Sequence, residues 1–133
     1  MPGEEKRRRR SSDPLIAARY QLEQVVHDFE LDTCVLVDDS GRLVQAPGLY
    51  PEFEEALARE TPRLANGSTC RLLFARLNRI HRVRPNQVSA CEFRAGGRRW
   101  YVAAVGSMST MREVGVFRAI LGLRRIEKHA AAA

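Results

Sequence analysis

The chain has no long apolar run, few aromatic residues and no paired-cysteine motif. Among its 133 residues, no apolar segment approaches the roughly 18 residues that a membrane-spanning helix needs. Aromatic residues are only 7% of the composition, and a core needs the same residues, which argues against base stacking by Trp100 and Tyr101. The charged run near the N-terminus is not followed by the apolar segment of a secretory signal. We therefore expect a cytoplasmic protein.

The three cysteines also favour a reducing compartment. Cys34, Cys70 and Cys91 are odd in number, far apart and placed among apolar neighbours. This pattern is typical of small, reduced core residues and not of disulfides or metal ligands.

The residues that carry chemistry in enzymes do not form a recognisable site. The chain lacks a Walker loop, a dinucleotide fingerprint and a Cys-x-x-Cys pair. Turn formation accounts for Asp38 and Asp39, and helix capping accounts for Ser107 and Ser109. The histidines, which are isolated from one another, are His27, His81 and His129. We therefore predict that the protein is not an enzyme and has no catalytic, cofactor-binding or metal-binding residues.

Charge is distributed unevenly along the chain. The formal net charge is +6, made up of +2 over residues 1–13, −6 over residues 14–70 and +10 over residues 71–133. Such polarity suits an electrostatically steered acidic protein partner or head-to-tail contacts between copies. Binding of nucleic acid by the basic tail and the basic C-terminal half is the alternative interpretation.

The first half of the chain predicts a helix followed by a hairpin. Asp13 and Pro14 have the pattern of a helix N-cap and first turn, and a helix is expected over residues 14–30. Its apolar residues at helical spacing are Leu15, Ala18, Leu22, Val25 and Phe29. Residues 33–37 are apolar on both faces, as in a covered central strand. Turn formers at 38–41, with Gly41 at a positive φ, lead to a second strand over 42–46.

A broken helix is expected next. It begins at Tyr50-Pro51, Pro62 kinks or ends it, and Asn66-Gly67-Ser68 supplies a stop and a fresh cap. The side chains along one side of its first part are Phe53, Ala56, Leu57, Glu60 and Leu64. A further helical piece covers residues 69–82. Its predicted inner residues are Leu73, Phe74, Leu77 and Ile80, and its predicted outer residues are Arg71, Arg76, Arg79 and Arg82.

The last third predicts a hairpin and a helix. Two alternating runs over residues 87–105 surround Ala95-Gly96-Gly97, and the second run is apolar on both faces, so we expect it to be covered on both sides. Thr110 and Glu113 have capping-box spacing. The apolar face expected for the helix is Val114, Phe117, Ile120, Leu121 and Leu123. A strip of small residues for close backbone approach is Gly115, Ala119 and Gly122.

These elements predict an α/β (α+β) fold with a single antiparallel β-sheet sandwiched by helices. The expected organisation is a disordered basic tail at 1–12, one domain at 13–128 and a flexible C-terminus at 129–133.

The element order resembles that of the Roadblock/LC7 family and its bacterial MglB-like branch. The resemblance covers roughly residues 14–126; it is carried by residues 35–44, the closing pair of strands and residues 107–117. The chain differs from the family at the break in the central helix and in its basic second half.

The resemblance implies a profilin-like architecture and dimerisation through the central helix and a neighbouring strand. It implies a homodimer, or a pair with a related Roadblock subunit, that serves as a scaffold or regulator of a small Ras-like GTPase in cell polarity or motility complexes. We expect subunit contacts from Phe53, Leu57, Leu64, Leu73 and Leu77. We expect partner recognition from Arg71, Arg76, Arg79, Arg82 and Arg84. Small-molecule sensing of GAF or PAS type, which needs a cavity of several hundred Å³, is a further alternative.

Overall fold

The computed structural model describes residues 13–67 and 71–132, with the side chains of residues 71–74, 85 and 129–132 left out. The elements are α2 (Pro14–Asp28), β1 (Thr33–Asp38), β2 (Leu43–Gln45), α3 (Pro51–Ala65), α4 (Arg71–Ile80), a 3-10 turn (Pro85–Gln87), β3 (Val88–Ala95), β4 (Arg98–Val105) and α5 (Ser109–Ala132). The predicted order of helices and strands is confirmed. The predicted tail at 1–12, the proposed cap at Ser68 and Cys70 lie outside the described residues.

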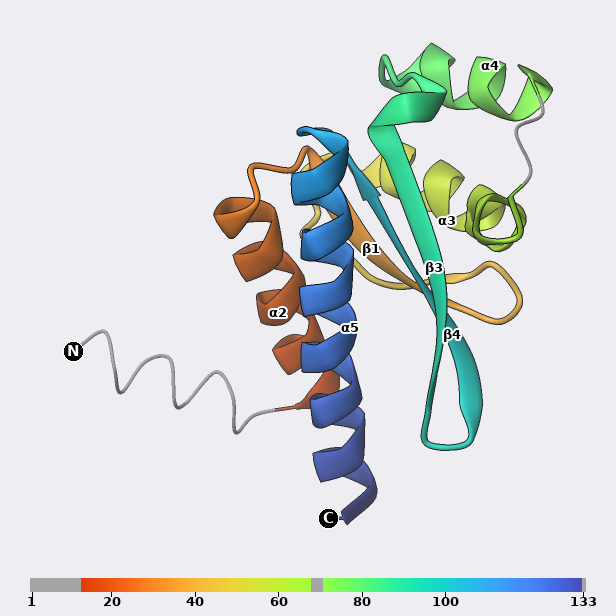
Figure 1. The fold of residues 1–133 in the computed structure, drawn as a ribbon. Coiled ribbons are helices and arrows are strands. Elements are labelled where there is room, and N and C mark those ends of the chain that lie inside the picture. The colour runs from red at the N-terminus through yellow and green to blue at the C-terminus, as the bar shows by residue number, and fades with distance from the viewer. Residues whose placement is uncertain (1–12, 68–70, 133) are drawn as a thin grey trace.

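One antiparallel sheet forms the middle layer, with strand order β2-β1-β4-β3. Strands β1 and β4 pair along their length, from Thr33 opposite Val105 to Asp38 opposite Trp100. Helices α2 and α5 cover one face, α3 covers the other, and α4 lies beyond α3 near the start of β3 (Figure 1). The expected α+β fold with a single antiparallel sheet is therefore confirmed for the described part of the chain.

Two apolar cores explain why the central strands have no polar face. Cys34, Leu36 and Val102 face α2 and α5, whereas Val35 and Val37 face α3. Adjacent residues of a strand point to opposite faces, so a strand covered on both sides is apolar at every position.

Close approach of α2 and α5 depends on small residues. A Cβ atom placed on Gly115 would lie 3.3 Å from the ring of Phe29, and one on Gly122 would meet the side chain of Gln21. The glycine strip of α5 thus packs directly against α2, as its spacing predicts. These contacts place the start of α5 beside the end of α2, so the two helices run antiparallel.

The tight turns also follow the sequence. Asp13 caps α2 by accepting a hydrogen bond from the backbone N–H of Leu15 at 2.8 Å. Gly41 has a φ of +83° in the β1–β2 turn, and Gly96 and Gly97 have φ values of +59° and +73° in the β3–β4 turn. Each position uses the positive φ that glycine adopts at little cost.

Pro62 does not end α3. The helix continues to Ala65, and Gly67 follows it at a φ of +83°. Pro62 lies in the last turn, so α3 lacks only the hydrogen bond that its missing N–H would donate and ends three residues later. Helix α5 in turn starts at Ser109, so Thr110 lies inside the helix instead of capping it, and the backbone remains helical to Ala132.

The expected inner face of α5 is partly wrong. Ile120 and Leu123 are buried, but Val114, Phe117 and Leu121 are 46%, 62% and 42% exposed. The glycine strip faces α2 on another side of the helix, and these three residues turn outward.

Three further burial predictions are also wrong. Cys91 is exposed because β3 is an edge strand. Ile80 is exposed at the end of α4, and Leu15 is exposed in the first turn of α2.

Candidate functional site

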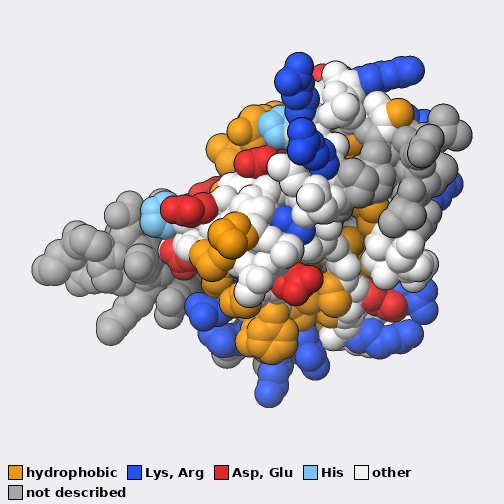
Figure 2. All heavy atoms as spheres, turned by 45° about the horizontal axis from the view of Figure 1, so that its top comes forward, with side chains coloured by type: hydrophobic (Ala, Val, Ile, Leu, Met, Phe, Trp, Pro, Cys, Tyr) orange, Lys and Arg blue, Asp and Glu red, His pale blue; other side chains and the backbone are white. Residues whose placement is uncertain are grey.

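Four of the five arginines predicted for partner recognition are exposed around α4. Arg76 and Arg79 lie on the helix, and Arg82 and Arg84 lie on the segment that follows it. We call these four residues the arginine surface. The side chain of Arg71, at the start of α4, lies outside the described residues. Figure 2 shows Lys and Arg side chains projecting from the upper part of the molecule, which carries α4 in Figure 1.

One member of the arginine surface is tied to α3. The Nη1 atom of Arg76 lies 3.8 Å from Oε1 of Glu60, and Nη1 of Arg63 lies 3.6 Å from Oε2 of the same carboxylate. Glu60 is largely buried, and its Oε2 atom accepts no hydrogen bond from the described residues, so the two arginines compensate its charge from a distance. Arg79 and Arg82 form no ion pair with another described residue and are free to meet a partner.

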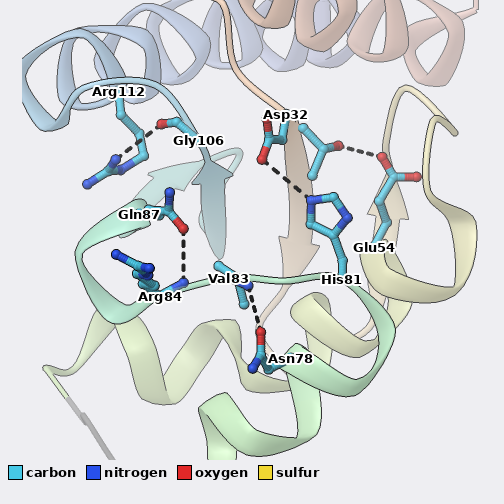
Figure 3. Close-up of polar contacts among 10 residues, drawn as sticks. Asp32, Glu54, Asn78, His81, Val83, Arg84, Gln87, Gly106 and Arg112 are labelled. Carbon is cyan, nitrogen blue, oxygen red and sulfur yellow. Dashed lines mark hydrogen bonds and ion pairs between the residues drawn. The ribbon is translucent and has the colours of Figure 1, made fainter.

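His81 anchors the end of α4. Its ring lies 4.7 Å from the ring of Tyr50 and 5.0 Å from the ring of Phe53, measured between centroids. Its Nε2 atom lies 3.5 Å from Oδ2 of Asp32, just before β1 (Figure 3). A histidine at this position therefore joins α4 to α3 and to the sheet, which is a structural role.

The segment between α4 and β3 is held by side-chain contacts to its backbone. Oδ1 of Asn78 accepts a hydrogen bond from the N–H of Val83 at 3.0 Å, and Oε1 of Gln87 accepts one from the N–H of Arg84 at 3.1 Å (Figure 3). These bonds hold the backbone that carries Arg82 and Arg84, which reduces the conformational entropy that a partner must freeze.

Arg112, near the start of α5, is a buried cation. Its guanidinium donates to the carbonyl oxygens of Gly106 and Asn86 at 3.1 and 2.7 Å, to that of Ser107 at 3.3 Å, and to Oγ of Ser89 at 2.8 Å. Burial lowers the pKa of this guanidinium, an effect that the charge of Glu113 partly offsets.

Arg112 thereby ties α5 to the turn before β3. Arg112 lies four residues before Val116, so both side chains are on the buried side of α5. This spacing is the feature of the sequence that could have indicated the burial of Arg112.

The hydrophobic residues expected at a subunit contact lie inside the protomer. Phe53, Leu57 and Leu77 are fully buried and belong to the core beneath α3, and Leu64 is partly buried against it. The side chain of Leu73 lies outside the described residues. Of the residues predicted for interactions whose side chains are described, the exposed ones are therefore those of the arginine surface.

The polar residues that suggested chemistry have structural roles. Oδ1 of Asp38 accepts hydrogen bonds from the N–H of Ser40 and Arg42 and from the hydroxyl of Ser40, and so closes the β1–β2 turn. Burial by itself raises the pKa of Asp38, but these hydrogen bonds outweigh it and hold the pKa below the ordinary value.

Two further groups are buried inside the protomer. Burial raises the pKa of the Cys34 thiol to about 12, which keeps it protonated and unreactive. The buried carboxylate of Glu54 accepts a hydrogen bond from the hydroxyl of Thr33.

Two hollows lie among the described residues. An apolar groove of about 60 Å³ lies between the start of α2, the end of α5 and the sheet, lined by residues that include Leu15, Trp100 and Ile126. A depression of about 450 Å³ between the β1–β2 turn and α3 is open to solvent. Neither is the enclosed cavity that a sensor domain of GAF or PAS type requires.

Two features are absent from residues 13–67 and 71–132. No group of three or more His, Cys, Asp or Glu side chains is placed to hold a metal ion. No helix there combines the length and the apolar character needed to cross a membrane.

Comparisons with known proteins do not place the chain in a family. No family model, no curated protein and no solved structure matches it. Functional assignment therefore depends on the surface described above.

Proposed function

We propose that the protein is a non-enzymatic interaction domain of Roadblock/LC7 type, acting as a dimeric scaffold or regulator of a small Ras-like GTPase. The proposal is supported by the element order and by the single antiparallel sheet with helices on both faces, which agree with the architecture that the resemblance implies. Contacts within the protomer account for the Asp38 carboxylate and the His81 ring.

The arginine surface is the observation that carries the proposal. Arg79, Arg82 and Arg84 are exposed, lie close together in the sequence, and sit on a helix and a segment that are anchored through His81 and Arg112. A rigid group of like charges favours fast association with an acidic surface. Because arginine forms planar two-pronged contacts with carboxylates, it also orients the partner.

The test begins with identifying the partner. The full chain, purified with its native partners, should yield a complex whose mass corresponds to this protein with a small GTPase. Arg79→Glu with Arg82→Glu should then slow association by about tenfold or more at low salt and flatten its salt dependence. Recovery of no GTPase, or unchanged association kinetics in this variant, would reject the proposal.

A matched control separates a local effect from a change in net charge. Arg94 and Arg98 are exposed on the β3–β4 hairpin, away from α4. Arg94→Glu with Arg98→Glu alters the net charge equally and should leave association within about twofold. Equal losses in both variants would show non-specific charge attraction.

Nucleic-acid binding by the same basic surface is the competing function, and it can be tested. Tyr101 is buried and the guanidinium of Arg98 covers the ring of Trp100 at 4.7 Å, so neither aromatic presents a free face for stacking. Tight binding of single-stranded nucleic acid with a steep salt dependence would favour that function instead.

A further inference from the structure

Helix α5 has two apolar faces, and only one of them is covered. The buried face contains Val116, Ala119 and Leu123, whereas Val114, Phe117 and Leu121 are exposed. Spacings of three and four residues place the exposed set in one row on the helix. Met111 extends this exposed apolar surface by one further step of three residues around the helix, and the strongly exposed Met108 immediately precedes the helix. We call these five residues the α5 stripe.

The α5 stripe is large for a surface without a partner. Its side chains are 38% to 73% exposed and together present on the order of 400 Å² of apolar surface. A stable interface buries roughly 800 Å² on each partner. The stripe therefore supplies about half of such an interface, and the neighbouring charged residues and α2 can supply the rest. Figure 2 shows exposed hydrophobic side chains in the lower middle of the view, with acidic and basic side chains around them.

Charges around the stripe are separated along the helix. At the start of α5, the exposed acid is Glu113, and the end of α2 beside it carries Asp28 and Glu30. At the other end of α5, the exposed residues include the bases Arg124, Arg125 and Lys128. This face is acidic at one end and basic at the other.

We propose that the α5 stripe binds the same stripe of a second copy of this chain, with the two helices antiparallel. A two-fold axis across the stripe reverses the direction of the partner helix, so the acidic end of each copy meets the basic end of the other. Parallel helices would instead place like charges together. Charge complementarity therefore favours a second copy of the chain as the binding partner, and it favours antiparallel α5 helices in the pair.

The antiparallel arrangement pairs specific residues. Glu113 and Arg124 lie about three helical turns apart on the same side of the stripe, and the two-fold axis falls midway between them. Glu113 then faces the partner's Arg124, and Arg124 faces the partner's Glu113. Phe117 and Leu121 lie on either side of the axis and pack against their counterparts.

Arg118 does not obstruct this contact. Its guanidinium lies 5.8 Å from the centroid of the Phe29 ring, toward α2 and away from the centre of the stripe. Its backbone carbonyl also accepts a hydrogen bond from the side chain of Gln21 at 3.2 Å. The apolar centre of the stripe is thus left free of charge.

The mass of the full chain in solution, measured over a range of concentrations, tests the proposal. The wild-type protein should form a dimer, and Phe117→Asp should raise its dissociation constant by about 30-fold or more. The matched control is Leu49→Asp, because Leu49 is similarly exposed but precedes α3. This control should dissociate like the wild type. Circular dichroism should show that both variants are folded, since both positions are at the surface.

An exchange of charges tests the orientation. Glu113→Arg and Arg124→Glu should each weaken the dimer by about tenfold, and the combined variant should recover nearly wild-type affinity because each pair is restored with reversed sign. A monomer at every concentration, a dimer insensitive to Phe117→Asp, or no recovery in the combined variant would overturn the proposal.

This inference rests on the proposed function only for the expectation of a dimeric platform, and the two can fail separately. A dimer with the expected sensitivities that binds no GTPase would reject only the proposed function. A GTPase-binding protein whose dimer is insensitive to Phe117→Asp would reject only the α5 contact.

Discussion

The guanidinium of Arg76 lies 3.8 Å from the carboxylate of Glu60, and this ion pair bridges the break between α3 and α4. The two residues are separated along the chain by Gly67, whose φ of +83° turns the backbone away from the helix. One arginine of the candidate interaction surface therefore also stabilises the position of α4. This double role separates Arg76 from Arg79 in a mutational test.

Reversing the charge at Arg76 should destabilise the protein, and reversing it at Arg79 should not. Arg76→Glu places a second carboxylate beside largely buried Glu60 and should lower the free energy of unfolding by about 1 kcal/mol. Arg79→Glu should change it by less than about 0.5 kcal/mol. Urea denaturation of both variants measures the difference, and equal stabilities would contradict the ion pair.

Removing the Arg112 guanidinium should be far more costly. Arg112→Met leaves the carbonyl groups of Asn86 and Gly106 without their donor and should lower the free energy of unfolding by about 3 kcal/mol or more. Arg112→Lys should recover only part of the loss, because lysine lacks the planar fork. Arg125→Met is the exposed control and should be nearly neutral. Denaturant titration compares the three, and a neutral Arg112→Met would exclude the organising role.

Two glycines with positive φ should respond differently to alanine. A Cβ atom on Gly106, at a φ of +98°, would lie 2.8 Å from the backbone nitrogen of Asp32, whereas one on Gly67 would meet no atom of a described residue within 4 Å. Gly67→Ala should cost about 1 kcal/mol from backbone strain alone. Gly106→Ala should cost at least about 3 kcal/mol because the clash with the backbone adds to the strain. Thermal unfolding of both variants provides the comparison.

The Asp38 turn should make a pH-dependent contribution to stability. Its folded pKa lies below the ordinary value of 3.8, so the stabilisation is fully present above that value and is lost as the pH falls through the folded pKa. Asp38→Asn should therefore be less stable than the wild type at neutral pH, and the difference should shrink under acid conditions. Asp39→Asn, at an exposed neighbouring position, is the control. Urea titrations from neutral to acid pH measure the difference in the free energy of unfolding between the wild type and Asp38→Asn. A difference that grows as the pH falls would contradict the prediction.

Much of the fold could be predicted because its signals are local. Asp13 and Pro14 mark the start of α2, and Gly41 closes the first hairpin. Apolar side chains on both faces of β4 mark it as a strand that is covered on both sides. The candidate surface could be partly predicted too, since Arg76 and Arg79 occupy the outer side of a helix whose inner side holds Leu77.

Other features could not be predicted because they depend on distant parts of the chain. Cys91 has apolar neighbours in sequence, but its strand lies at the sheet edge and leaves it exposed. Arg112 is one charged residue among many until Asn86 and Gly106 are brought to its guanidinium. His81 is an isolated histidine until the rings of Tyr50 and Phe53 surround it.

By itself, the sequence determined the order of the helices and strands, the positions of the turns and the two-sided burial of the central strands. These depend on backbone preferences and on the periodicity of side chains, which act over a few residues. Tertiary structure alone decided which apolar row of α5 faces the core and which faces outward. Both rows have helical spacing, and only the contact of Gly115 and Gly122 with α2 selects between them, because burial depends on which distant surface arrives to exclude water.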